Sequence, residues 1–84
     1  MNRTDVLQAA NEAVSRRNES YGQPEDNFST IAELWSVYLR HEVQPFDVAM
    51  MMALLKIARA RNDEYNEDNL VDLAGYAACA AECV

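Results

Sequence analysis

The sequence predicts an all-α fold, with four helices in a four-helix bundle-like single domain that is completed by homo-oligomerisation. Apolar residues recur at steps of three and four in four segments, as expected for helices that bury one face. No segment shows the apolar–polar alternation, bounded by turn residues, that is typical of strands. The 84 residues fit one small domain. A chain of this length buries only about 60 to 65 per cent of its unfolded surface, so contacts with a partner would stabilise it.

The chain divides into an N-terminal helix at residues 1–20 and a three-helix core at residues 27–84. Thr4 is a good N-cap residue for the first helix, and the apolar positions after it keep helical spacing. Gly22 and Pro24 interrupt regular structure and therefore predict a loop between this helix and the core.

The second helix is expected to begin after Asn27 or Ser29, either of which can serve as its N-cap. It ends between Leu39 and His41, where the cationic Arg40 suits the negative end of the helix dipole. Its apolar stripe, which we interpret as core, consists of Phe28, Ile31, Ala32, Trp35, Tyr38 and Leu39.

Pro45 is placed in the first turn of the third helix, which runs to about Arg61. Every residue from 48 to 55 is apolar, so this helix has no polar face for two turns and must be covered on all sides. Three other short helices cover it poorly. We therefore predict a homo-oligomer, most simply a two-fold dimer, in which the methionines at 50–52 pack partly against the partner.

Asn66 starts the fourth helix as an N-cap, and acids follow in the first turn. We interpret its core stripe as Leu70, Leu73, Ala74, Ala77, Ala81 and Val84. A neighbouring stripe carries Asn69, Asp72, Tyr76, Cys79 and Cys83. The two cysteines are best explained as small, buried apolar residues.

The net charge of −7 disfavours direct binding to nucleic acid, because phosphate affinity requires clustered Lys and Arg. The N-terminus lacks the apolar region of a signal peptide, and the central apolar run is too short to cross a bilayer. One histidine and two cysteines make no plausible zinc set. These features predict a reduced, cytosolic protein that does not enter the membrane.

Asp72 is the most informative residue, because it lies a full turn into a helix among apolar neighbours. A carboxylate there is costly unless it is paired or reaches solvent in a cleft. Lys56 or Arg59 on the preceding helix is the expected partner, and Tyr76 shares the Asp72 face. Two interpretations remain open: a salt bridge that joins two helices, and part of a ligand or metal site.

Four acids are candidates for holding Mg²⁺ if the last three helices pack together, since this ion prefers carboxylates together with substrate phosphates. Two of them also have simpler explanations, because Asp47 follows Pro45 at the positive end of a helix dipole and Glu33 completes a capping box. No Gly-rich phosphate loop or Ser-His-Asp set is present, so catalysis by a protein nucleophile is unsupported and enzyme status stays open. The metal candidates are Glu33, Asp47, Asp68 and Asp72.

Three segments carry a resemblance to a known family: Tyr21-Gly22-x-Pro24-x-x-Asn27-Phe28-x-x-Ile31-Ala32-x-Leu34-Trp35, Asp47-Val48-Ala49-Met50-Met51-Met52-Ala53-Leu54-Leu55-Lys56-x-Ala58-Arg59, and Asp68-Asn69-x-x-Asp72-Leu73-Ala74-Gly75-Tyr76-Ala77-Ala78. They resemble a small domain of unknown function found in bacteriophages and prophages. The last segment is also similar to a helix of MazG-like and phage nucleotide-modification-associated proteins, which are all-helical, oligomeric and magnesium-dependent and act on nucleoside triphosphates.

This resemblance implies roles for particular residues. Asp68 and Asp72 would bind magnesium and Lys56 would meet phosphate, while Asn69 and Tyr76 would line the site; Arg59 is a further ligand-binding candidate. MazG-like enzymes also carry a Glu-Glu-x-x-Glu motif on an earlier helix. Only the isolated Glu33 and Glu42 occur in that region here. Either catalysis is lost, or a partner subunit supplies the missing acids.

The leading functional prediction is therefore a phage or prophage protein that binds or hydrolyses nucleotides in a MazG-like, Mg²⁺-dependent manner. Two alternatives belong to other classes. One is a small acidic phage protein that inhibits a host defence complex by protein–protein interaction, for which the compact size and the negative charge are suitable. The other is a structural or regulatory helical module without a ligand.

Overall fold

The computed structural model describes residues 1–62 and 64–84, apart from the side chains at positions 17, 18, 20 and 21. Those residues form four helices and contain no strand, which confirms the predicted all-α class. The helices are α1 (Arg3–Tyr21), α2 (Pro24–Leu39), α3 (Pro45–Asn62) and α4 (Glu67–Ala81).

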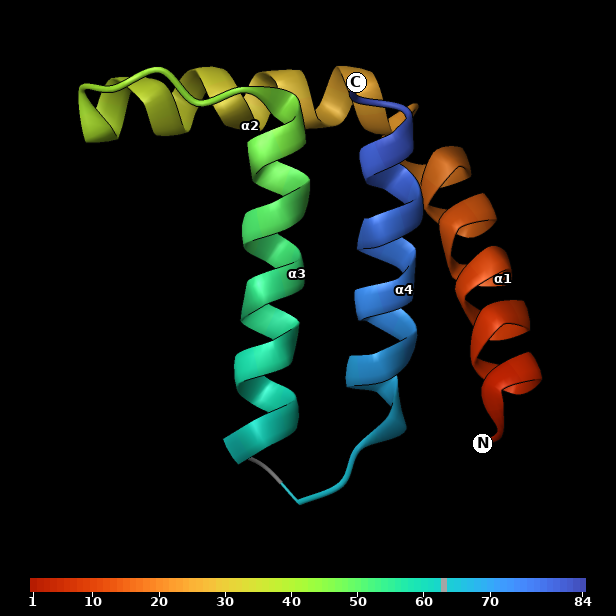
Figure 1. Ribbon diagram of the computed structural model, residues 1–84. Helices are drawn as coiled ribbons and strands as arrows, with labels where there is room; N and C mark the ends of the chain where they lie inside the picture. Colours follow the sequence, from red (N-terminus) through yellow and green to blue (C-terminus); the bar gives the residue numbers. More distant parts are fainter. Residues whose placement is uncertain (63) are drawn as a thin grey trace.

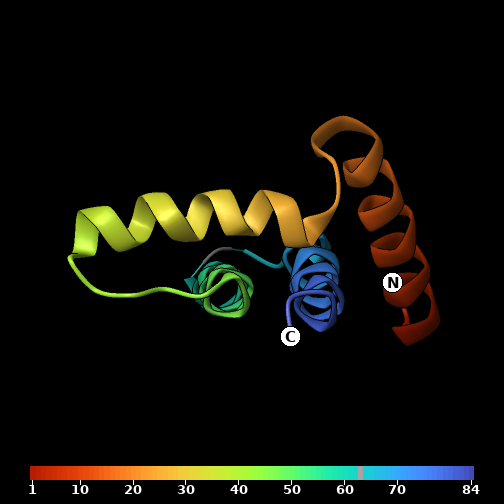
Figure 2. The ribbon, with the colours of Figure 1, turned by 90° about the horizontal axis from the view of Figure 1, so that it is seen from above.

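Three helices lie side by side, and the remaining one crosses their ends. α3 and α4 form an antiparallel hairpin, and α1 packs on the side of α4 that faces away from α3 (Figure 1). α2 runs across the upper ends of α3 and α4, and its C-terminal half extends beyond α3 in both views (Figures 1 and 2). Three of the helices are therefore arranged as in a bundle, and α2 packs across the ends of α3 and α4.

The first two helices begin earlier than predicted. The N–H of Asp5 donates to Oδ1 of Asn2 at 2.9 Å, so Asn2 rather than Thr4 caps α1. α2 begins at Pro24, with Gln23 as its N-cap, and neither Asn27 nor Ser29 is a cap. The prediction treated Pro24 only as a helix breaker, although the fixed φ of proline and its missing N–H suit the first helical turn.

The starts of α3 and α4 and the end of α2 agree with the prediction. Oδ2 of Asp47 accepts a hydrogen bond from the N–H of Gln44 at 2.9 Å, which places this acid at the start of α3. Oδ1 of Asn66 accepts from the N–H of Asp68 at 3.0 Å and caps α4. α2 ends at Leu39, and the next residue, Arg40, closes the helix with a φ of 54°.

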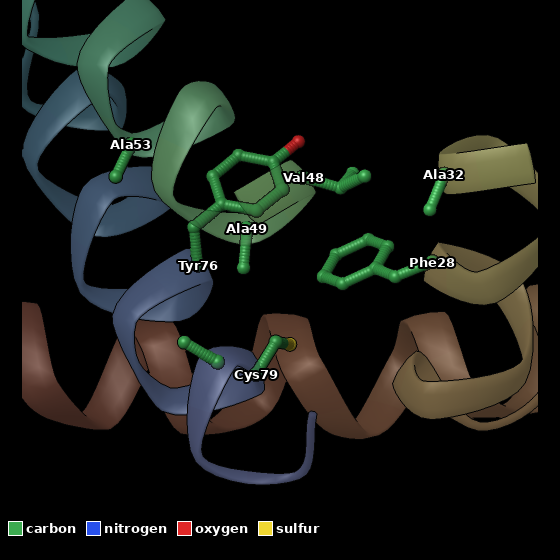
Figure 3. Packing of buried hydrophobic residues seen from close by; sticks show 8 residues of the cluster. Phe28, Ala32, Val48, Ala49, Ala53, Tyr76 and Cys79 are labelled. Carbon is green, nitrogen blue, oxygen red and sulfur yellow. The ribbon is translucent and has the colours of Figure 1, made fainter. Parts of the chain in front are cut away.

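The core lies where α2 crosses the α3–α4 hairpin (Figure 3). Val48 is fully buried at its centre. The rings of Phe28 and Tyr76 have centroids 6.4 Å apart and are tilted by 31°, a separation within the range for aromatic pairs. The cluster consists of Phe28, Ala32, Val48, Ala49, Ala53, Tyr76, Cys79 and Ala80.

The predicted core stripe of α4 is wrong at four of its six positions, because Leu70, Ala77, Ala81 and Val84 are exposed. Leu73 packs against the core, and Ala74 is half-buried. The neighbouring stripe is the buried one, with Asn69, Tyr76 and Cys79 all inside. α4 is contacted by α3 and by α1. These contacts therefore bury a face of α4 that contains polar side chains. The face that is richest in leucine and alanine stays exposed.

The α2 stripe is core only in its first half. Phe28 and Ala32 are buried, whereas Tyr38 and Leu39 lie on the part of α2 that extends beyond α3 and are exposed. Single-chain packing also leaves α3 partly uncovered, as its sequence predicted. Of the three methionines, Met51 is exposed, and Met50 and Met52 pack against the core. No described helix is both long enough and apolar enough to span a membrane.

Candidate functional site

Lys56 and Asp72 form an ion pair that joins α3 to α4. Nζ of Lys56 lies 2.8 Å from Oδ2 of Asp72. The antiparallel hairpin brings the middle of α3 opposite the middle of α4, which is why residues 16 positions apart in the sequence meet. The predicted pairing of Asp72 is confirmed with Lys56, while Arg59 is exposed near the end of α3.

The two members of the pair differ in their access to water. The side chain of Lys56 is 13% exposed and that of Asp72 is 42% exposed. Burying an ammonium group is costly unless an acceptor stays beside it. The carboxylate therefore stabilises Lys56 in the fold and keeps contact with solvent, where it can also meet a solute.

The other candidate residues on α4 lie about one helical turn before or after Asp72. Asp68 is one turn earlier and exposed, so both carboxylates project from the same side of the helix. Asn69 is buried, with an exposed fraction of 6%. Tyr76, one turn later, directs its ring into the core against Phe28 (Figure 3). The main role of the Tyr76 side chain is therefore to pack the core.

The four predicted metal ligands do not come together within one chain. Across residues 1–62 and 64–84, no three His, Cys, Asp or Glu side chains gather closely enough to hold a metal ion. Asp47 precedes Lys56 by nine residues, which is roughly 14 Å along the helix axis. Glu33 is exposed on α2, the helix that runs across the ends of α3 and α4. Only Asp68 and Asp72 share one helix face.

Two hollows on α4 are unequal in size. The one beside Asp72, between α1 and α4, has a volume of about 20 Å³. A much larger, open hollow of about 710 Å³ lies at the start of α4 and is lined by residues 64–67. It includes Tyr65, whose side chain is 72% exposed. The sequence reasoning missed Tyr65, although an aromatic residue in a polar connector is the signal that identifies it.

Cys79 lies in the last part of α4, and Cys83 lies just after the helix ends. Cys79 is buried in the core and Cys83 is half-buried. Burial raises the pKa of the Cys83 thiol above its ordinary value of 9.0, and the neighbouring Cys79, Glu25 and Glu82 raise it further. The neutral thiol is therefore the favoured form, as expected for a packing residue.

Residues 5–84 match a family described as a domain of unknown function (DUF6378). The chain belongs to this family. The match includes α2, α3, α4 and α1 from its third residue, and therefore both members of the Lys56–Asp72 pair. The predicted relation to a small phage domain of unknown function is confirmed by this family together with its phage relatives, described next. The further similarity to MazG-like proteins remains a prediction.

Two relatives come from mycobacteriophages. The chain is 44% identical to the Gene 55 protein of Mycobacterium phage D29 over 75 residues, which cover 88% of this chain and 50% of that protein. It is 46% identical to the Gene 55 protein of Mycobacterium phage L5 over 74 residues, covering 86% of this chain and 47% of that protein. The chain thus spans about half the length of these relatives. No solved structure matches it.

Proposed function

We propose that this DUF6378 domain is a phage module that binds the phosphates of a nucleotide, together with Mg²⁺, at the face that carries Lys56 and Asp72. The observation that supports the proposal is the 2.8 Å ion pair with its half-exposed carboxylate. A lysine ammonium is a compact positive charge that suits phosphate oxygens. A carboxylate open to water suits a hard cation that accompanies them.

The acids on α4 fit the way in which proteins usually hold Mg²⁺. One or two carboxylates commonly bind this ion, and waters and substrate phosphates supply its remaining ligands. Asp68 and Asp72, one turn apart, would provide the two carboxylates. When bound, the ion would neutralise phosphate charge and polarise phosphoryl oxygens. Asn69, next to Asp68 and buried, would fix the position of this helix face.

The base of the nucleotide has to bind at the surface of the domain. The hollow beside Asp72 holds only about 20 Å³, far below the 300 Å³ or more that is usual for a ligand pocket. The open hollow at the start of α4 presents the exposed ring of Tyr65, on which a base can stack. In this proposal the phosphates meet Lys56 and the base lies toward Tyr65.

Binding is the activity that the residues of one chain support by themselves. MazG-like hydrolysis uses more acids than Asp68 and Asp72, and Glu33 lies on α2, outside their helix face. Hydrolysis would therefore need acids from a second copy of the chain. Cytoplasmic action in a bacterial host belongs to the same proposal, because nucleotides and Mg²⁺ are available there.

The proposal can be tested by thermal denaturation of the full chain with a panel of nucleoside mono-, di- and triphosphates, with and without MgCl₂. Ligand at 100 times its Kd stabilises the folded state by about 2.7 kcal/mol. For a chain of this size that raises Tm by roughly 11 to 22 °C. Asp72→Asn and Lys56→Gln should lose this rise relative to their own ligand-free Tm. Glu12→Gln, which removes an exposed acid from α1, should keep it. Absence of any nucleotide response in the unsubstituted protein would refute the proposal.

A second candidate function is binding to a host protein, as in inhibition of a defence complex. The observation that favours it is the exposed C-terminal half of α2, where Leu34, Val37 and Tyr38 face solvent on a chain of net charge −7. Affinity capture from a bacterial host extract would test it. A captured host protein should be lost with Val37→Glu and retained with Leu7→Glu, a substitution of an exposed apolar residue on α1.

A further inference from the structure

The outward side of α3 carries a regular stripe with a polar residue at each end. Asp47, Met51, Leu54, Ala58 and Arg61 follow one another at steps of four and three, which places them on one side of the helix. All five are exposed. The buried residues of α3 lie on the opposite side of the helix, so among the described residues this stripe is left exposed, with only Met51 bordering α2.

The middle of the stripe is apolar and continues onto α2. Leu54 is 63% exposed and Met51 is 42% exposed. Met51 also lines an apolar groove of about 430 Å³ with Trp35, Tyr38 and Leu39 of α2. The C-terminal half of α2, to which these three residues belong, extends beyond α3 (Figures 1 and 2). The stripe and the groove adjoin at Met51, so a helix of another molecule can pack against both.

The positions of the charged residues along the stripe indicate that the helix packing against it is α3 of a second copy. Asp47 and Arg61 each lie seven residues from Leu54, on opposite sides of it. If two copies of α3 pack antiparallel about a two-fold axis at Leu54, Asp47 of each copy meets Arg61 of the other. Met51, three residues before Leu54, then lies close to Ala58, four residues after it, so that a large side chain packs beside a small one. Parallel packing would instead place like charges together.

We propose that this domain forms a two-fold homodimer through the stripe of α3, with Leu54 of both copies at the axis and α2 of each copy lying over the end of the other copy's α3. A two-fold interface must be self-complementary, because the same patch is used on both chains. The opposite charges at equal distances from Leu54 meet this condition. This proposal is independent of nucleotide binding, because Lys56 lies on the inward side of α3.

The first test is the oligomeric state of the full chain, measured by light scattering after size-exclusion chromatography and by sedimentation equilibrium. The unsubstituted protein should be a dimer at micromolar concentration, and Leu54→Glu should be a folded monomer by circular dichroism. Leu7→Glu is the matched control, since Leu7 is 66% exposed on α1. It should remain a dimer. A monomeric unsubstituted protein, or a dimer that survives Leu54→Glu, would overturn the proposal.

Cysteine cross-linking locates the axis without requiring a monomer to fold. Two cysteines at a two-fold axis can reach the roughly 3.8 Å Cβ separation of a disulfide. Mild oxidation of Leu54→Cys should therefore give a covalent dimer. The unsubstituted protein, whose Cys79 is buried and whose Cys83 is half-buried, should not cross-link at a comparable rate, and neither should Leu7→Cys. Faster cross-linking of Leu70→Cys than of Leu54→Cys would place the axis on α4 and overturn the assignment.

The charge pattern has its own test. Arg61→Glu places an acid opposite Asp47 at both symmetric positions of the dimer. Exposed ion pairs are individually weak, so the dimer dissociation constant should rise roughly 2- to 30-fold for the two positions together. Arg59→Glu makes the same change of charge off the stripe and should have a smaller effect. Equal effects of the two substitutions would refute the antiparallel register.

Discussion

Asp72→Asn and Lys56→Met should destabilise the protein to different extents, because water reaches the two side chains unequally. Asp72→Asn leaves a Lys56 ammonium that is only 13% exposed without its negative partner. Losing a hydrogen bond to a charged group costs roughly 1.5 to 3 kcal/mol. The loss of 3 to 5 kcal/mol that is typical of fully buried pairs is not expected, because Asp72 is 42% exposed and solvent screens the pair.

Lys56→Met should cost less, below about 1 kcal/mol. It leaves a carboxylate that solvent can hydrate, and the methionine side chain keeps the apolar packing of the lysine stem. A chain of 84 residues has a total stability of roughly 4 to 13 kcal/mol. The substitution of Asp72 should therefore remove a large fraction of it, and the substitution of Lys56 a small one.

Urea denaturation followed by circular dichroism would measure both changes, with a Tm scan as a second readout. Asp72→Asn should lower Tm by roughly 6 to 24 °C. The double variant completes a cycle and should be more stable than Asp72→Asn alone, since it removes the unpaired ammonium. Equal losses for the two single variants, or a larger loss for Lys56→Met, would show that this account of the pair's asymmetry is wrong.

Three further predictions concern the rest of the fold. Val48→Ala, at the fully buried centre of the core, should lower the free energy of unfolding by roughly 2 to 3 kcal/mol in the same urea assay, and a loss below 1 kcal/mol would mean that the site collapses around the cavity. Asn66→Ala should cost about 1 kcal/mol by removing the cap of α4, whereas Asn66→Asp should cost little. Alkylation of Cys83 by iodoacetamide should need a higher pH in the folded protein than in urea, because burial raises its pKa above 9.0. The stabilising contribution of the neutral thiol is then complete below the unfolded pKa and is lost as the pH rises through the folded value, so equal pH profiles in the two states would contradict it.

Local signals in the sequence were sufficient for the presence of the four helices, for the starts of α3 and α4 and for the ion pair. Helix starts at Pro45 and Asn66 follow from capping chemistry, and a carboxylate among apolar neighbours calls for a cation on the adjacent helix. The buried face of α4 could not be predicted in the same way. Leu70 and its neighbouring alanines make the more apolar stripe, yet the helix buries Asn69 and Tyr76, because its contacts with α1 and α3 decide which face is covered.

The metal candidates show a related limit. Glu33, Asp47, Asp68 and Asp72 can converge only if their helices run together, and the sequence does not reveal that α2 crosses the ends of the others. Spacing within one helix is reliable, so the pair on α4 remains together. Spacing between helices depends on crossing geometry, so the other two acids could not be placed from the sequence.

The uninterrupted apolar character of α3 has a different explanation on each of its sides. Its inward side holds Val48 and Ala53 in the core and anchors Lys56 beside Asp72. Its outward side, centred on Leu54, is left to a second copy. The two proposals therefore predict separable defects. Leu54→Glu should abolish the dimer and retain Mg²⁺-dependent nucleotide binding, while Asp72→Asn should retain the dimer and lose that binding. If Leu54→Glu also removes nucleotide binding while remaining folded, the nucleotide site extends across the dimer interface and the separation of the two sides is incorrect.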